Sequence, residues 1–165
     1  MDFDRLYREL YPSLHRYLCR LTGDPEAAND AAQEAFMTLL RRQLPESEVK
    51  PWLFTVATNV VRDRARRDKT RRRLVPKVRL LTPHPSRPDD EAERADTIRT
   101  VRDALERIPE RDRKLLLLRE EGFSYKEIAE AVGVAPGSVG TLIARALKKF
   151  EAEFGSTGNE NESRD

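Results

Sequence analysis

The sequence contains a single cysteine, Cys19, so an intrachain disulfide is excluded. Its two histidines, His15 and His84, are far apart, whereas a zinc site needs about four closely spaced ligands. We therefore expect no metal and no cofactor. No segment approaches the ~18 apolar residues of a membrane helix, and the charged start from Asp2 onward lacks the apolar region of a signal peptide. These features favour a cytoplasmic protein without membrane insertion.

The sequence also has little net charge, because 31 basic residues oppose 29 acidic residues. A net charge of +2 gives no argument for a nucleic-acid partner, so such an argument must rest on how the charges are distributed. Charged residues make up 36% and hydrophobic residues 38%, which favours small units with thin cores. Apolar residues recur at three- and four-residue steps, which predicts an all-α fold.

Two small helical domains joined by a flexible linker are expected. The first, residues 1–74, holds helices that Pro12 breaks or kinks and that Pro51 restarts after a polar loop at 43–50. Four prolines and an acid-rich end mark residues 75–96 as the linker, although an ordered loop packed on a domain is the alternative. The second domain covers residues 97–154. The polar tail, residues 155–165, is expected to be disordered.

The last third of the chain has the parts of a helix-turn-helix between residues 124 and 150. Ser124 and Glu127 form a capping box, Gly133 supplies the turn, and Pro136 opens the second helix. Such a second helix can enter a DNA major groove. The polar side chains on its outer face are candidates for contacts with bases or phosphates; they are Ser138, Thr141 and Arg145. The alternative is a helical hairpin that only packs.

Residues 62–73 form a strongly basic stretch, in which eight basic side chains oppose two acidic ones, a local charge of +6. Such density suits phosphate neutralisation by counterion release. A charge run is often only a solvated helix face, but this one continues a helix that bears Trp52 and Phe54. Aromatic rings beside a basic track suit single-stranded DNA. Trp52 itself is either a core residue, which we favour, or a stacking surface.

Four stretches, in order, resemble the extracytoplasmic-function (ECF) sigma factors of bacterial RNA polymerase. Residues 30–36 (DAAQEAF) resemble the family pattern D-x-x-Q-E-x-F, and residues 51–59 (PWLFTVATN) resemble W-L-f-x-i-A-x-N. Residues 105–118 resemble the start of the family's C-terminal domain, and residues 121–129 (EGFSYKEIA) resemble E-G-x-s-y-x-E-I-A. The resemblance implies a factor that binds core RNA polymerase and promoter DNA, directs transcription initiation and has no enzymatic activity.

The resemblance also implies roles for residues of the N-terminal domain. Its position on the family pattern makes Asn59 the residue that captures a base pulled out of the −10 element, with the loop 43–50 as the other wall of the pocket. Three arginines would hold phosphates nearby; they are Arg62, Arg66 and Arg67. The polar residues expected to dock on the polymerase clamp are Asp30, Gln33 and Glu34.

In this family the helix-turn-helix reads the −35 element, and here the sequence departs from the family pattern. Gly140 and Leu142 stand where basic or polar side chains are common, so the base-reading set is small. Gly140 also costs about 1 kcal/mol of helix propensity relative to alanine. The family implies one further partner, an anti-sigma factor that covers both domains.

Two other functions are compatible with parts of the sequence. A stand-alone helix-turn-helix regulator with a separate N-terminal interaction domain explains residues 124–150 but leaves residues 30–36 and 52–67 without a role. An enzyme acting on nucleic acid would need a set of catalytic groups, and we find no paired carboxylates, metal cluster or glycine-rich phosphate loop.

Overall fold

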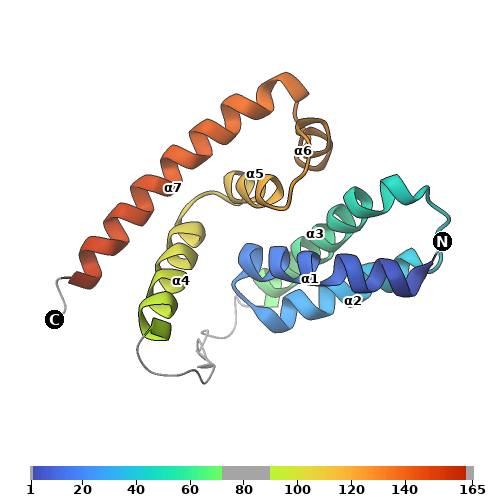
Figure 1. Ribbon diagram of the computed structural model, residues 1–165, viewed down its shortest axis with the longest axis horizontal. Helices are drawn as coiled ribbons and strands as arrows, with labels where there is room; N and C mark the ends of the chain where they lie inside the picture. The colour runs from blue at the N-terminus through green and yellow to red at the C-terminus, as the bar shows by residue number, and fades with distance from the viewer. Residues whose placement is uncertain (1, 72–89, 163–165) are drawn as a thin grey trace.

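The computed structural model describes residues 2–71 and 90–162, and all regular structure within those ranges is helical. The all-α prediction is therefore confirmed. Figure 1 shows α1, α2 and α3 bundled together, with α4, α5, α6 and α7 forming a second group beside them. The elements are α1 (Phe3–Thr22), α2 (Pro25–Leu39), α3 (Glu46–Arg71), α4 (Asp90–Arg107), α5 (Glu110–Glu120), α6 (Tyr125–Val132), the 3-10 helix η2 (Pro136–Ser138) and α7 (Val139–Glu162).

The junction between α1 and α2 follows from its sequence. Gly23 ends α1 in the left-handed conformation, with φ of 69°, which a residue with a side chain rarely adopts. Asp24 then caps α2 by accepting hydrogen bonds from the backbone N–H groups of Glu26 and Ala27, and Pro25 occupies the first helical position. Small side chains on the inner face of α2 are fully buried, which lets α1 and α3 pack closely against this helix; they are Ala28, Ala31, Ala32 and Ala35.

Pro12 does not break its helix and Pro51 does not start one, contrary to two expectations from the sequence. Pro12 lies inside α1, which continues on both sides of it because residues before and after it pack against the core. The polar loop expected at residues 43–50 is also shorter, since α3 begins at Glu46 and contains Pro51. Val49, fully buried, gives this extra helical turn a hydrophobic anchor that the sequence pattern did not reveal.

Two helices of the second group extend beyond the predicted bounds of residues 97–154. α4 starts at Asp90, inside the acid-rich stretch expected to be linker, and acidic residues favour the N-terminal end of a helix. α7 continues to Glu162, whereas a disordered tail was expected from residue 155; each residue added to an existing helix gains a hydrogen bond at little cost. The linker predicted at residues 75–96 falls mostly outside the described residues. No helix in the described ranges could span a membrane.

The hydrophobic core continues from one domain into the other. Within the first domain it contains Tyr17 and Phe54, and within the second Leu115 and Ile128. α5 belongs to the second group and contacts both α1 of the first group and α7 of its own (Figure 1). The two domains are therefore packed against each other.

Candidate nucleic-acid interface

One face of α3 is buried and the opposite face is exposed and polar. Leu53, Phe54 and Ala57 are buried, whereas Asn59 and Arg62 are exposed. Asn59, Arg62 and Arg66 follow one another at steps of three and four residues, so they share one side of the helix. The structure thus brings three of the four predicted −10 residues into one stripe. Arg67 is exposed beside it.

A buried hydrogen bond fixes the rotation of α3 next to Asn59. The hydroxyl of Thr58 donates to the carbonyl oxygen of Phe54 at 2.7 Å and lies 3.0 Å from the hydroxyl of Tyr17. Because the single proton of Thr58 is used on Phe54, the Tyr17 hydroxyl donates to Thr58 Oγ1. Burial raises the pKa of Tyr17 far above its ordinary value, so this donor keeps its proton. With Thr58 held inward, Asn59 must point to solvent.

The arginines in and beside this stripe pair with acidic residues of two other helices, α5 and α2. Arg62 Nε lies 3.5 Å from Glu110 Oε1 at the start of α5. Arg64, which lies between Arg62 and Arg66 in the sequence, contacts α2 instead: its guanidinium lies 3.3 Å from Asp30 Oδ2 and 2.9 Å from Glu34 Oε2. These pairs are exposed and worth at most about 1 kcal/mol each. Arg62 can therefore exchange Glu110 for another partner at little cost.

Trp52 lies near the start of α3, where its ring is half-buried and packs against the hydrophobic core. The guanidinium carbon of Arg42 lies 5.9 Å from the ring centroid, a cation–π distance. The placement favours the core interpretation of Trp52 over a stacking surface. The basic stretch continues beyond Arg67, but the side chains of residues 69–73 are outside the described structure.

The three residues expected to dock on polymerase are exposed on one side of α2. Asp30 and Glu34 are one turn apart and share Arg64, as described above. Gln33 Nε2 donates to Asn29 Oδ1 at 3.4 Å, and Asn29 in turn accepts a hydrogen bond from the hydroxyl of Tyr11. Phe36, on the opposite side of α2, is buried and packs on the rings of α1. Asp30, Gln33 and Glu34 are thus exposed on one side of α2, while its opposite side packs against α1.

The helix-turn-helix consists of α6, η2 and α7. Ser124 accepts a hydrogen bond from the backbone N–H of Glu127, whose carboxylate accepts from the Ser124 N–H, so the predicted capping box is present. Gly133 ends α6 with φ of 77°. On α7, Val139 and Ile143 are buried. The predicted base-reading residues are exposed and follow one another at steps of three and four residues; Ser138 ends η2, and Thr141 and Arg145 lie on α7.

The two departures from the family pattern have structural explanations. Leu142 is half-buried and packs against the core, so it is not part of the exposed stripe. Gly140 faces Tyr125: a Cβ built on Gly140 would lie 3.4 Å from Cε2 of that ring. Arg119 donates to the Tyr125 hydroxyl at 2.6 Å and its guanidinium lies 5.5 Å from the ring centroid. Gly140 therefore provides the surface on which the Tyr125 ring rests.

Polar contacts from α5 hold the helix-turn-helix in place. Lys114 Nζ donates to the carbonyl oxygen of Ala131 near the end of α6 at 2.6 Å, and burial lowers the pKa of this lysine. Asp112, nearly buried, accepts from Lys149 Nζ on α7 at 2.5 Å. These two links join α5 to both helices of the motif. Sequence reasoning missed them, because each joins residues separated by 17 or 37 positions.

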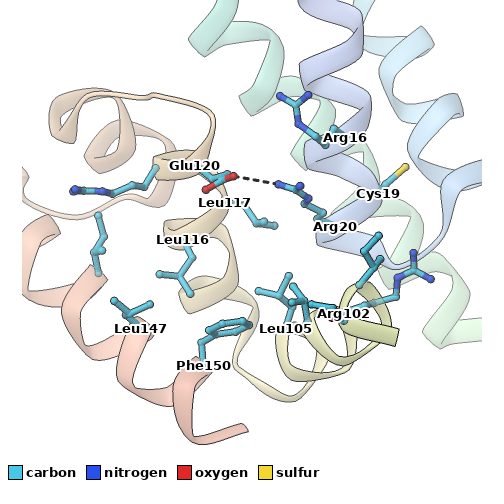
Figure 2. A pocket seen from close by; sticks show the side chains of 15 residues that line it. Arg16, Cys19, Arg20, Arg102, Leu105, Leu116, Leu117, Glu120, Leu147 and Phe150 are labelled. Carbon is cyan, nitrogen blue, oxygen red and sulfur yellow. Dashed lines mark ion pairs between the residues drawn. The ribbon is translucent and has the colours of Figure 1, made fainter. Parts of the chain in front are cut away.

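An apolar groove of about 640 Å³ lies where α1, α4, α5 and α7 meet (Figure 2). Figure 2 shows Leu105, Leu116, Leu147 and Phe150 around it, and an ion pair between Arg20 of α1 and Glu120 of α5 across its edge. Cys19 also lines the groove. Burial raises the pKa of its thiol, so a smaller fraction is present as the reactive thiolate. The described residues contain no cluster of side chains suited to a metal ion.

Comparison with protein families finds two regions of similarity. Residues 6–72 match Sigma-70 region 2, and residues 98–150 match Sigma-70, region 4. The first match runs from within α1 to the end of α3, and the second from within α4 to the middle of α7. They include every candidate residue described above.

Similar proteins extend over almost the whole chain. The RNA polymerase sigma factor YlaC of Bacillus subtilis is 31% identical over 99% of this chain and 96% of its own length. The ECF RNA polymerase sigma factor SigL of Mycobacterium tuberculosis is 34% identical over 92% of this chain and 90% of its own length. The sigma factor RpoE from Bartonella quintana, solved in complex with the anti-sigma factor NepR, aligns with a TM-score of 0.70 at 22% identity, covering 92% of this chain and 96% of that chain. That likeness indicates a shared fold.

Proposed function

Since the chain belongs to the ECF RNA polymerase sigma factors, which direct promoter recognition and are not enzymes, we propose how its residues divide that work. The N-terminal domain, residues 1–74, docks on core polymerase and recognises and opens the −10 element. The C-terminal domain, residues 97–154, reads the −35 element, and residues 75–96 link the two. The exposed stripe of α3 is the observation that supports this division most directly.

In the proposed −10 site, Asn59 captures a base extruded from the duplex. Its side-chain amide offers two donors and one acceptor to a base edge, and it is exposed on a helix whose rotation is fixed by Thr58 and Tyr17. Arg62, Arg66 and Arg67 hold the phosphates. Removing a base from the stack costs a few kcal/mol, so the pocket must recover that energy after the strands separate. The role of Asn59 is therefore in opening rather than in duplex binding.

Core polymerase docks on the exposed side of α2, through Asp30, Gln33 and Glu34. The two carboxylates lie one turn apart and can each accept a basic side chain from the polymerase. Arg64 neutralises both in the free protein, but through exposed pairs that cost little to exchange. The docking surface is thus acidic, and Arg64 offsets its charge in the free protein.

The −35 contact relies on three exposed residues, Ser138 at the end of η2 and Thr141 and Arg145 on α7. Because Gly140 and Leu142 are engaged with Tyr125 and the core, they add nothing to base reading. A set of two hydroxyls and one guanidinium gives few bidentate contacts, and each such contact contributes about 1–3 kcal/mol of discrimination. The contact with the −35 element is therefore weaker than the contact with the −10 element.

Run-off transcription tests the proposal. Core polymerase, a pool of promoter fragments and this protein are combined, and transcripts that require the protein are mapped. Promoter-dependent transcripts are expected from the protein with core but not from either alone. Absence of both transcripts and core binding would overturn the proposal. Tight duplex binding without polymerase would instead support the stand-alone helix-turn-helix regulator.

Two further assignments follow from membership of the family. The protein acts in the cytoplasm, where core polymerase and the chromosome are found. An anti-sigma factor is a proposed partner, supported by the likeness to the RpoE chain that was solved with NepR. Co-purification from cells of the source bacterium tests both, since polymerase subunits and one small regulator are expected to accompany the tagged protein.

A further inference from the structure

Lys114 of α5 is a buried charged side chain that the proposed DNA and polymerase contacts do not use. Only 5% of the residue is exposed, and burial lowers the pKa of its ammonium group. Lysine is rarely buried unless its charge has a partner, because removing an ammonium group from water is costly. The partner here is the backbone carbonyl oxygen of Ala131, which accepts a hydrogen bond from Lys114 Nζ at 2.6 Å. This contact joins α5 to the last turn of α6.

The last turn of α6 needs such a donor, because the final four carbonyl groups of a helix have no partner within it. The carbonyl oxygen of Ala129 accepts from the backbone N–H groups of Gly133 and Val134, at 2.8 and 3.0 Å. The carbonyl oxygen of Ala131 accepts from Lys114 instead, so a neighbouring helix supplies this cap. The helix dipole also favours a positive charge at this end. Lys114 therefore fixes the end of α6 to α5 by hydrogen bonding and by charge.

The end of α6 determines where the DNA-contacting part of the helix-turn-helix begins. Gly133 ends α6 in the left-handed conformation, and η2 starts only three residues later, at Pro136. η2 packs against α6 and ends at Ser138, one of the proposed base-reading residues. A displacement of the end of α6 relative to α5 would therefore move Ser138 relative to the DNA.

α7 is attached to α5 by a separate contact. Asp112, two residues before Lys114, accepts a hydrogen bond from Lys149 Nζ of α7 at 2.5 Å. Side chains two positions apart point to nearly opposite sides of a helix, so α5 holds α6 on one side and α7 on the other. The angle between the two helices of the motif is thus set through α5, and Lys114 is the polar link to α6.

A preformed angle matters here because the proposed base-reading set has only three members. Gly140, in the first turn of α7, favours the helical conformation less than alanine would. A surface that must be ordered when it binds loses affinity to that ordering. Contacts that order the motif before it meets DNA avoid this loss.

We propose that Lys114 is a positioning residue for −35 recognition, because its ammonium group caps α6 from α5 and so holds η2 and Ser138 in the orientation that fits DNA. The inference rests on the proposed function, since it requires that the helix-turn-helix reads the −35 element. Lys114 itself is buried and touches no DNA. Its loss leaves the base-reading side chains intact but lets the angle between α6 and α7 vary.

A distance measurement between α6 and α7 tests the proposal without DNA. In a Cys19→Ser background of the full chain, Glu130→Cys on α6 and Glu151→Cys on α7 give exposed sites for spin labels. Pulsed electron paramagnetic resonance should give a narrow distance distribution for this background. Lys114→Met keeps the length of the side chain but removes its charge and its donor, so the distribution should broaden or shift. An unchanged distribution would refute the positioning role.

Arg111→Met is the matched control. Arg111 is exposed on the same helix, so its substitution removes one positive charge without affecting the end of α6, and the distribution should remain that of the background. If Arg111→Met broadens it equally, the proposal is wrong. Replacing a buried charge by an apolar side chain of similar size is often neutral for stability, so urea unfolding should give a similar midpoint for Lys114→Met. Lys114→Leu should behave alike, and it replaces Lys114→Met if that variant does not fold.

DNA binding in the complex with core polymerase gives the functional measurement. The probes are the −35 duplex of a promoter mapped by run-off transcription, a duplex of the same bases in scrambled order, and the −10 single strand. Lys114→Met should weaken binding of the −35 duplex by about three- to tenfold, because only molecules with the correct angle bind it. Binding of the other two probes should be nearly unchanged.

Two outcomes separate this proposal from the proposed function. Equal weakening of all three probes by Lys114→Met would show a general structural role and refute the positioning role. Failure of the unsubstituted protein to direct any transcript would refute the proposed function instead, while the distance measurement would still report on Lys114.

Discussion

Removing the hydrogen bond between Tyr17 and Thr58 should lower the free energy of unfolding by different amounts, depending on which of the two residues is substituted. Tyr17→Phe removes the donor and leaves Thr58 still donating to Phe54, so the cost is that of an ordinary hydrogen bond, about 0.5–1.5 kcal/mol. Thr58→Val removes the acceptor and leaves the fully buried Tyr17 hydroxyl without a partner, which costs about 1–3 kcal/mol. Both residues lie in the core of the N-terminal domain, so solvent cannot replace the lost bond.

Urea unfolding followed by circular dichroism measures the difference. Thr58→Val should lower the unfolding free energy about twice as much as Tyr17→Phe, and for a chain of this size each 1 kcal/mol lowers the melting temperature by about 2–4 °C. Thr58→Ser is the control that keeps the hydroxyl and loses only a methyl group. If Tyr17→Phe is the more damaging change, the donor assignment is wrong, because Thr58 would then be left as the unpaired donor.

The same residue predicts an alkaline limit to stability. Burial raises the pKa of Tyr17 in the folded state above its value of about 10 in the unfolded chain. Ionisation of this tyrosine therefore leaves the free energy of unfolding unchanged below about pH 10. Above that pH the tyrosine ionises in the unfolded chain first, which lowers the free energy of unfolding by up to about 1.4 kcal/mol per pH unit. Tyr17→Phe should remove this part of the decline. An unchanged alkaline profile in Tyr17→Phe would show that other groups cause it.

Two other substitutions test the proposed DNA contacts, and a third tests the packing at Gly140. Asn59→Ala should slow promoter opening, measured by permanganate reactivity, while leaving initial duplex binding nearly unchanged; an equal loss of both would contradict base capture. Arg145→Ala should reduce the slope of log affinity against log salt by about one unit for a −35 duplex, and an unchanged slope would remove this residue from the phosphate contacts. Gly140→Ala should raise the unfolding free energy by up to about 1 kcal/mol, because a methyl group there meets Tyr125 at an ordinary contact distance. A destabilised Gly140→Ala variant would mean that the ring cannot tolerate that contact.

Local signals in the sequence predicted much of this fold correctly. The capping box at Ser124 depends on residues three positions apart, and the apolar periodicity of α7 depends on steps of three and four. Such signals are visible in a single segment, so the helix-turn-helix and the exposure of Ser138 and Thr141 could be anticipated. Asn59 was predicted as a site residue from the family pattern rather than from periodicity, and its exposure on α3 became known only from the structure.

Helix ends were harder to predict because tertiary burial decides them. Nothing local distinguishes Val49 from a loop valine, yet its complete burial starts α3 at Glu46, before Pro51. The departure at Gly140 was interpretable only once Tyr125 was placed over it. In both cases the deciding contact comes from a residue outside the local pattern, so no propensity argument could have found it.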